Sequence, residues 1–284
     1  MAGSSYLAGR RVIWTAILIL GIAAYLGWIA FAYAIQDHLV FARWVANPRV
    51  TTTIPHGVTS HWLTRPDGET IEAWRVLPAH ADPNAKLPTV LFAHGNGELI
   101  DTVMPLANRL ANQGFQVILP EYRGYGRTPG KPSQKMLIED VGAWYDEVAT
   151  WPTTDADEMI LMGRSIGGSV AAHVAADRSP AGVVLLITPA RCDQFAWRYG
   201  VPPILAAHPF RTDKVIGRVT CPIFLLGHRQ DEIVPPAHLE LLASLAADAT
   251  VVEIDGTHNM VATEADRITR DDAIEAFLSR ITQK

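Results

Sequence analysis

The chain has 284 residues, a length that suits one large domain or two small ones. It has 49% hydrophobic and 19% charged residues, a formal net charge of −5 and no basic cluster, so it is typical of a globular protein and nucleic acid is not an expected partner. The two cysteines, Cys192 and Cys221, form neither a C-x-x-C pair nor a zinc spacing. We therefore predict no thiolate metal site and leave open a disulfide between them.

A long apolar segment lies near the N-terminus. Residues 12–35 carry no charge, and as an α-helix these 24 residues would be about 36 Å long, enough to cross a hydrocarbon core of about 30 Å. Tryptophans near both ends of the segment would suit the membrane interfaces. The segment is too long for a signal-peptide core, and residues 36–39 make a poor cleavage site. We predict an uncleaved transmembrane anchor, with a buried helix or a removed signal peptide as the alternatives.

Positive charges on the two sides of this segment bear on its orientation. Arg10 and Arg11 precede it and favour a cytoplasmic N-terminus, although Arg43 and Arg49 on the other side weaken that bias. The expected localisation is a membrane, with the rest of the chain outside the cytoplasm. The predicted organisation is a short tail over residues 1–11, the anchor over 12–35, a connector over 36–57 and a folded domain over 58–284.

The elements expected after the connector begin with a hairpin and then alternate. Runs of β character at residues 58–63 and 70–77 flank a turn at Asp67-Gly68, as in a hairpin at a sheet edge. Apolar runs then predict strands at residues 89–93, 115–119, 159–164, 182–187, 222–226 and 250–254, separated by amphipathic helices. This alternation predicts an α/β fold with a mainly parallel central sheet flanked by helices.

Two stretches of the domain carry more specific expectations. Apolar residues recur at helical spacing over residues 99–110, and Gly114 is expected to end that helix. Residues 190–215 are rich in proline, have no clean period, and are expected to form a small cap or an irregular connector.

The sequence Gly163-Arg164-Ser165-Ile166-Gly167 has the G-x-S-x-G spacing of a nucleophile elbow, in which a serine stands on a sharp turn between a strand and a helix. Such a turn needs neighbours without side-chain bulk, because the flanking backbone passes close to the serine. An apolar run precedes the motif and a good helix-forming sequence follows it. We interpret Ser165 as a catalytic nucleophile, with a purely structural turn as the alternative.

A serine nucleophile needs a base within hydrogen-bond reach and an acid that orients the base. In a parallel sheet these groups are expected on loops at the carboxyl ends of strands. Two loops qualify: residues 227–235 contain Asp231, and residues 256–259 contain His258. We predict His258 as the base and Asp231 as the acid, in the chain order nucleophile, acid, base.

Other residues compete for both roles. His228 precedes the acid and would break the chain order, and His173 falls inside the helix after Ser165, where it is expected to pack. The alternative acids are Glu232, Asp193 and Asp255. Asp231 itself has an alternative interpretation as a turn or capping residue.

Stabilisation of an oxyanion requires two backbone N–H groups. Ile166 is expected to supply one, because it begins the helix after Ser165. The loop His94-Gly95-Asn96-Gly97 follows an earlier strand, and Gly95 allows its backbone to approach a substrate. We predict the Asn96 amide as the second donor and interpret His94 as a residue that orders the loop.

Five segments in this order resemble the α/β-hydrolase superfamily. They are residues 90–97, 121–126, 163–168, 227–235 and 256–258, within a domain of about residues 58–284. Together with the single anchor, the H-G-N, Y-R-G-Y-G and G-R-S-x-G-G sequences are similar to membrane-anchored hydrolases related to lysophospholipid lipases and protein depalmitoylases. The resemblance implies a serine esterase, thioesterase or lipase without a cofactor. Gly97-Glu98 departs from the small apolar pair that is commoner there, and Glu121 replaces a frequent aspartate.

The leading hypothesis is a membrane-anchored serine hydrolase that cleaves carboxylic esters or thioesters through an acyl-enzyme, with small-molecule or lipid esters as substrates. A peptidase or amidase on the same scaffold is the alternative enzyme. The alternative of another class is a non-catalytic protein that keeps the fold for binding. No metal and no cofactor are expected.

Overall fold

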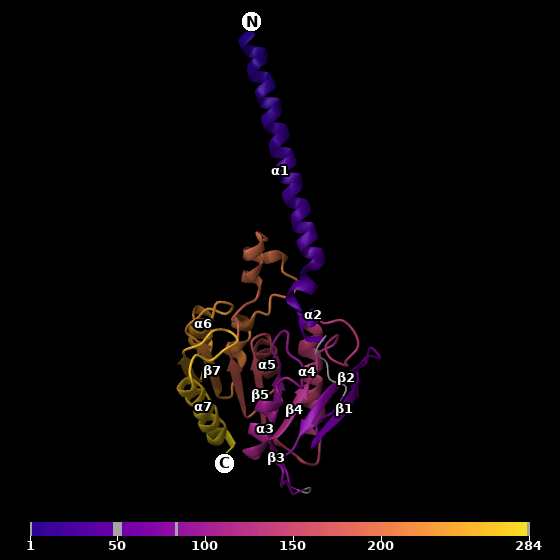
Figure 1. The fold of residues 1–284 in the computed structure, drawn as a ribbon, viewed down its shortest axis with the longest axis vertical. Helices are drawn as coiled ribbons and strands as arrows, with labels where there is room; N and C mark the ends of the chain where they lie inside the picture. Colours follow the sequence, from indigo (N-terminus) through magenta and orange to yellow (C-terminus); the bar gives the residue numbers. More distant parts are fainter. Residues whose placement is uncertain (1, 48–52, 83–84, 283–284) are drawn as a thin grey trace.

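The computed structural model describes residues 2–47, 53–82 and 85–282, with side chains from residue 10 onward. These residues form an eight-stranded sheet with helices on both faces, from which a long helix, α1, projects (Figure 1). The strands are β1 (Val58–Thr64), β2 (Thr70–Val76), β3 (Leu87–Ala93), β4 (Gln116–Pro120), β5 (Thr154–Arg164), β6 (Gly182–Leu186), β7 (Ile223–His228) and β8 (Ala249–Ile254). The helices of the domain are α3 (Met104–Asn112), α4 (Gln134–Ala149), α5 (Ile166–Ala176), α6 (Ala237–Leu245) and α7 (Glu264–Thr282).

The strand order is β1-β2-β4-β3-β5-β6-β7-β8. The hairpin β1–β2 and the pair β2–β4 are antiparallel, and the pairs from β4 to β8 are parallel. The predicted α/β fold, with a mainly parallel sheet and a hairpin at its edge, is confirmed. Because parallel strands end at the same edge of the sheet, the loops after β3, β5, β7 and β8 lie near one another.

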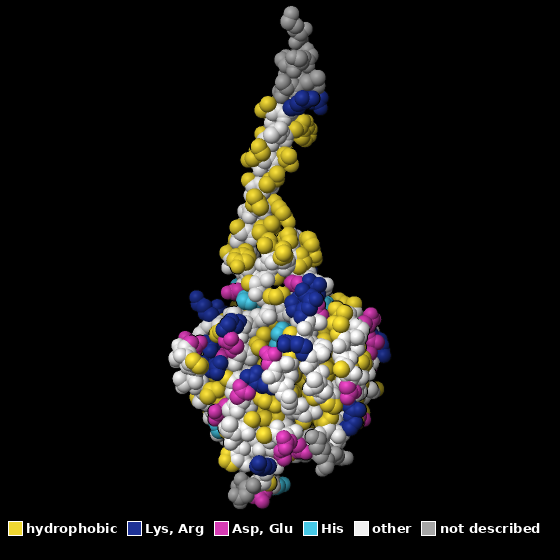
Figure 2. Space-filling view, turned by 180° about the vertical axis from the view of Figure 1, so that it is seen from behind, with side chains coloured by type: hydrophobic (Ala, Val, Ile, Leu, Met, Phe, Trp, Pro, Cys, Tyr) yellow, Lys and Arg dark blue, Asp and Glu magenta, His cyan; other side chains and the backbone are white. Residues whose placement is uncertain are grey.

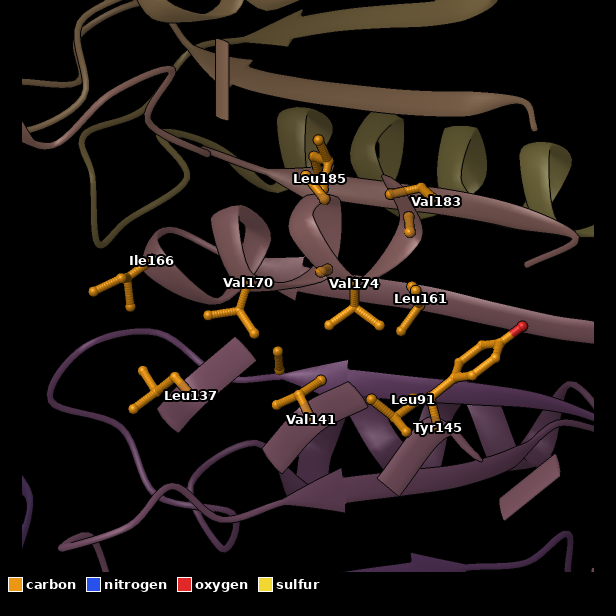
Figure 3. Packing of buried hydrophobic residues seen from close by; sticks show 14 of the residues in the cluster. Leu91, Leu137, Val141, Tyr145, Leu161, Ile166, Val170, Val174, Val183 and Leu185 are labelled. Atoms are coloured by element: carbon orange, nitrogen blue, oxygen red, sulfur yellow. The ribbon is translucent and has the colours of Figure 1, made fainter. Parts of the chain in front are cut away.

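Neighbouring residues of the central strands enter two separate cores. Leu91 of β3 and Leu161 of β5 belong to the core that includes α4 and α5, whereas Val90 and Ile160 belong to the core that includes α3 and α7. This is the two-residue period of strands covered on both faces. Figure 3 shows one of these cores, in which Val170 and Val174 of α5 point towards Val141 of α4. α5 is therefore enclosed, and its first residue is held at the end of β5.

α1 runs as one helix over Ala2–Val40. It contains the predicted anchor and continues into the predicted connector, whose residues 48–52 lie outside the described residues. Within Arg10–Val40 its mean hydropathy is 2.2 and its most apolar window is not buried in the protein, so α1 is long and apolar enough to cross a membrane. These properties are compatible with a membrane anchor or with a signal sequence.

The chain after α1 packs into the domain. A short helix, α2 (Arg43–Ala46), follows α1. Phe41 and Ala46 are each only 1% exposed and belong to the same core as Leu91 and Leu161. The base of α1 is thus attached to the domain by buried apolar contacts. Figure 2 shows that the hydrophobic side chains of α1 broaden into an apolar region where the helix meets the domain.

Two stretches of the domain carried specific expectations from the sequence. The helix expected over residues 99–110 begins only at Met104, because residues 99–103 form turns in which the Thr102 hydroxyl donates to the Leu99 carbonyl at 2.7 Å. Residues 190–215 form a cap of short 3₁₀ helices, η2 (Asp193–Tyr199), η3 (Pro203–Leu205) and η4 (Thr212–Lys214). Cys192 and Cys221 are both free thiols.

Candidate active site

Ser165 lies on the sharp turn between β5 and α5. Its backbone has φ 54° and ψ −122°, a conformation that a residue with a side chain rarely adopts. A Cβ on Gly167 would lie 2.1 Å from the Ala93 carbonyl oxygen, and a Cβ on Gly163 would lie 2.3 Å from that of Gly167. The two glycines of the motif are therefore required by close backbone packing, as the spacing predicted.

A chain of hydrogen bonds joins Ser165 to the loops after β7 and β8. The Ser165 hydroxyl lies 3.0 Å from Nε2 of His258, and Nδ1 of His258 lies 2.8 Å from Oδ2 of Asp231. The His258 and Asp231 side chains are 9% and 0% exposed. The structure thus brings together the three residues that the sequence selected from three separate loops, in the geometry of a serine, its base and an orienting carboxylate.

Asp231 is held in place by both of its oxygens. Oδ1 accepts the N–H groups of Ile233 and Val234 at 2.9 and 2.7 Å, while Oδ2 accepts from His258. Burial alone would raise the pKa of Asp231, but the hydrogen bonds from His258 and these two amides lower it below its usual value. An ionised Asp231 keeps the proton of His258 on Nδ1, so that Nε2 is free to accept the proton of Ser165.

The competing histidines have other partners. His228 donates from Nδ1 to the Thr257 carbonyl at 2.6 Å, and burial lowers its pKa, so it is a neutral residue that supports the loop of His258. His173 donates from Nδ1 to the Ser169 carbonyl at 2.7 Å on α5, and burial lowers its pKa as well.

The competing carboxylates are also engaged elsewhere. Asp193 forms an ion pair with Arg191 at 2.6 Å, and Asp255 forms one with Arg229 at 2.9 Å. Glu232 accepts the main-chain N–H of His258 at 3.4 Å. Among the carboxylates of the described residues, Asp231 is the one recorded in hydrogen-bond contact with the imidazole ring of His258.

Asn96 and Ile166 line the same cavity as Ser165 and His258. Ile166 is the first residue of α5, where a backbone N–H has no acceptor within its own helix. In the described part of the chain, the N–H of Asn96 likewise has no recorded acceptor. Two unpaired amides beside the serine hydroxyl are what an oxyanion hole requires.

The side chain of Asn96 ties its loop to the end of α1. Its Nδ2 donates to the Val40 carbonyl at 2.7 Å, and its Oδ1 accepts the Ala42 N–H and the Tyr125 hydroxyl, both at 2.8 Å. Every polar atom of this side chain except one amide hydrogen is thereby used. From the sequence, Asn96 is expected only as a main-chain donor, because no sequence pattern marks its contact with α1.

Glu98 joins three parts of the site, a role that the sequence analysis did not identify. Its Oε2 accepts the Gly95 N–H at 2.6 Å, and its Oε1 forms an ion pair with Arg164. Arg164 also donates to the His258 carbonyl at 3.1 Å. The loop after β3, the elbow and the loop after β8 are therefore connected by one carboxylate–guanidinium pair.

His94 orders the loop from beneath, as the sequence interpretation expected. Its ring is fully buried, with Nε2 2.8 Å from Oε1 of Glu121 and Nδ1 2.9 Å from the Gly95 carbonyl. Burial acts to lower the pKa of His94, but the charge and hydrogen bond of Glu121 outweigh it and raise the pKa. The Tyr122 hydroxyl adds a hydrogen bond to the His94 carbonyl at 2.8 Å.

A cavity of about 490 Å³ opens beside Ser165. One wall comes from α1 (Ala32, Tyr33, Gln36, Leu39 and Val40), and another comes from the cap, including Phe195, Val201 and Leu205. Within the described residues, the lining contains no Asp or Glu. Cys192 lies in the lining too, but burial raises the pKa of its thiol to about 12, so it is protonated and does not compete as a nucleophile.

The chain is similar to known proteins in sequence and in fold. Residues 84–210 match the family described as serine aminopeptidase, S33. The chain is 29% identical over 206 residues to the α/β hydrolase domain-containing protein WAV2 of Arabidopsis thaliana, covering 66% of each chain. It is 26% identical over 211 residues to the uncharacterised protein YfhR of Escherichia coli K12, covering 72% of this chain and 74% of YfhR. The acetyl xylan esterase from Paenibacillus sp. R4 has a TM-score of 0.64 at 17% identity, over 81% of this chain and 86% of the esterase.

The fold is that of an α/β-hydrolase, and WAV2, a relative by sequence, is named for an α/β hydrolase domain. The likeness to the esterase, at 17% identity, shows the fold alone. The finer resemblance to lysophospholipid lipases and protein depalmitoylases stays a prediction.

Replacing Asp231 by Asn should abolish most activity without changing the fold. An amide in place of the carboxylate removes the charge that holds His258 in the required tautomer, so kcat/KM should fall by roughly 10⁴-fold. The measurement is p-nitrophenyl acetate hydrolysis at neutral pH, with circular dichroism to verify folding. Glu232→Gln is the matched control and should stay within about tenfold of wild type. A greater loss in Glu232→Gln than in Asp231→Asn would assign the acid to Glu232.

Replacing Asn96 by Ala should slow the reaction although the main-chain N–H is retained. The variant loses the contacts to Val40, Ala42 and Tyr125, so the amide is no longer held in position, and kcat should fall about 10- to 100-fold. Asn47→Ala is the matched control, because Asn47 ties the same N-terminal region to Gly124 at 2.9 Å, away from Ser165. Equal kcat values for both variants and wild type would show that the docking of Asn96 has no part in catalysis.

Proposed function

We propose that this chain is a membrane-anchored serine hydrolase that cleaves carboxylic esters or thioesters through an acyl-enzyme. The observation that carries the proposal is the hydrogen-bonded series Ser165–His258–Asp231, with distances of 3.0 and 2.8 Å, beside two unpaired amides. Each group has the partner that its task requires, and the three come from loops that a parallel sheet brings to one edge.

In the first half of the reaction, Ser165 attacks the substrate carbonyl carbon while Nε2 of His258 takes the hydroxyl proton. The charge on the carbonyl oxygen is stabilised by the Asn96 and Ile166 amides, and the ionised Asp231 stabilises the imidazolium. As the tetrahedral intermediate collapses, His258 gives its proton to the departing alcohol or thiol. The acyl group is then bonded to the Ser165 oxygen.

In the second half, water takes the place of the alcohol or thiol. His258 removes a proton from the water, the resulting hydroxide attacks the acyl carbon, and the same two amides stabilise the second intermediate. Collapse releases the carboxylic acid, and the proton held by His258 returns to Ser165. The proton taken from Ser165 leaves with the alcohol or thiol, and the proton taken from water returns to Ser165. The proposed reaction therefore balances without a metal ion or a cofactor.

The cavity favours an acyl substrate over a peptide with a free amino group. Its walls are largely apolar, and an α-ammonium group would find no carboxylate in the described lining. An aminopeptidase or amidase is nevertheless the second candidate function, because the matched family is described as a serine aminopeptidase. A lipid or long-chain ester, as in the lysophospholipid lipases and depalmitoylases that the sequence resembles, is the substrate that we favour.

α1 is proposed to anchor the chain in a membrane, with the catalytic domain outside the cytoplasm. Support for the anchor comes from its length, its mean hydropathy of 2.2 and its lack of burial. Support for the orientation comes from Arg10 and Arg11 at its N-terminal end.

A fluorophosphonate probe tests the nucleophile. Wild type should be labelled because Ser165 is activated by His258, whereas Ser165→Ala should not be labelled at all. Ser169→Ala, which removes another serine hydroxyl near the start of α5, is the control and should be labelled like wild type. Equal labelling of wild type and Ser165→Ala would refute the assignment.

The same protein then separates the candidate functions. Hydrolysis of p-nitrophenyl esters should rise as the acyl chain lengthens beyond acetyl, and amino-acid p-nitroanilides should be turned over much more slowly. Preference for the anilides would establish the peptidase instead. Probe labelling with no turnover of either series would favour a binding protein.

The proposed orientation predicts that the domain is accessible to protease added from outside the cytoplasm. Protease added to intact cells or spheroplasts should digest the domain, because residues 58–284 would lie outside the cytoplasm. A cytoplasmic marker protein should survive the same treatment. Digestion only after permeabilisation would reverse the orientation and leave the enzymatic proposal intact.

A further inference from the structure

The cap exposes apolar side chains at its tip, which we define as residues 197–205. Trp197 is 61% exposed, Tyr199 is 51% exposed and Ile204 is 90% exposed. Such large side chains in one short segment are uncommon on a surface that faces only water. Figure 1 shows this orange segment rising above the rest of the domain on the side from which α1 projects.

The tip is hydrogen-bonded to α1 well above the base of the helix. The Trp28 indole N–H donates to the Tyr199 carbonyl at 2.8 Å, and the Tyr25 hydroxyl donates to the Gly200 carbonyl at 3.0 Å. Lower down, Gln36 accepts the Ala207 N–H at 2.7 Å. The cap therefore lies along α1 over a length of several turns.

The position of these contacts determines how deep the tip would lie. A hydrocarbon core of about 30 Å takes about 20 helical residues, and any such window inside the uncharged residues 12–35 includes residues 16–31. Tyr25 and Trp28 are then inside the core whichever window is chosen, at depths of about 5 to 15 Å from its nearer surface. Because the tip is bonded to these two residues, it lies at the same depth.

The tip is suited to that environment. A carbonyl group within lipid must have a hydrogen-bond donor, and α1 supplies one to Tyr199 and one to Gly200. Residues 199–207 carry no charge. The guanidinium of Arg198 donates to the Glu232 carbonyl at 3.0 Å, so this charge is directed towards the domain.

We propose that the cap tip is a second membrane contact that inserts into the leaflet beside α1. This inference rests on the proposed anchor and hydrolase, and it adds the bilayer as the binding partner of the cap. The cavity at Ser165 lies between the two inserted elements, since its walls come from α1 and the cap. An acyl chain can therefore reach Ser165 from the hydrocarbon core without crossing water, which identifies a bilayer-resident ester or thioester as the substrate class.

Depth-dependent quenching tests the insertion. The full chain with Ile204→Cys, labelled with the fluorophore NBD and reconstituted into phosphatidylcholine vesicles, should be quenched by doxyl-labelled lipids and protected from aqueous iodide. Ile268→Cys on α7, a site with 49% exposure, is the matched control and should show the opposite pattern. Leu18→Cys in α1 is the positive control for depth. The wild-type chain, which contains only Cys192 and Cys221, gives the background labelling.

Each outcome of this measurement bears on the proposal. Iodide access at residue 204, with Leu18→Cys still quenched by lipid, would overturn insertion of the cap while leaving the anchor in place. Iodide access at both positions would contradict the anchor itself. The label at residue 204 could also be protected from iodide without being quenched by lipid. If that protection depended on protein concentration, it would indicate that a second copy of the chain covers the tip, and it would overturn the proposed insertion.

A kinetic comparison tests the substrate route. Ile204→Asp should lower turnover of a long-chain ester embedded in vesicles by about 10- to 100-fold, because a carboxylate in the hydrocarbon core opposes insertion. In Ile204→Asp, hydrolysis of soluble p-nitrophenyl acetate and fluorophosphonate labelling should stay at wild-type levels. Ile268→Asp is the control and should change neither of these nor the turnover of the long-chain ester. If Ile204→Asp lost turnover equally on both esters, the proposed substrate route from the bilayer would be overturned. If the probe did not label the wild type, the proposed hydrolase function itself would be refuted.

Discussion

The close packing of α5 against the end of β3 is the contact on which the site depends. At Gly167 the backbone of α5 approaches the Ala93 carbonyl so closely that no Cβ fits, and at Gly168 the Thr188 side chain occupies the equivalent space. This contact holds Ser165 at φ 54°, a conformation that costs on the order of 1 to 3 kcal/mol. Burial of most of α5 in the core that it shares with α4 offsets that cost. The same approach brings the loop after β3 next to the first amide of α5, so one packing contact fixes both the serine and its neighbouring donors.

The loops around Ser165 are positioned by charged and polar side chains that do not themselves reach the serine hydroxyl. Glu98 links the Gly95 amide to Arg164, and Arg164 links the elbow to the His258 carbonyl. His228 holds the adjacent Thr257 carbonyl. Because the loops share these contacts, none of them can move without the others. Such shared contacts keep the side chains around Ser165 close to fixed positions.

The sequence was most informative where a local pattern has one structural solution. The G-x-S-x-G spacing placed Ser165 on a turn between a strand and a helix, and the rule that parallel strands end at one edge placed Asp231 and His258 on loops that the structure brings within hydrogen-bond reach of each other. The expected start of the helix at Leu99 was wrong, because turn-forming hydrogen bonds of Thr102 outweigh an apolar spacing that suits a helix. The role of Glu98 was missed because its partners, Gly95 and Arg164, are brought together only by the fold.

The contribution of α1 to the site could not be foreseen from composition, because its contacts are made by individual side chains and main-chain groups that only the fold brings together. Val40 and Ala42 at its end are bound by Asn96, and Phe41 between them is buried in the core. Five residues of α1, the first of them Ala32, form a wall of the cavity. Without these residues the cavity would lack that wall. The N-terminal helix thus completes a wall of the cavity beside Ser165, and the residues at its end are bonded to the loop after β3, so that a segment far from the catalytic domain in sequence helps to shape the site.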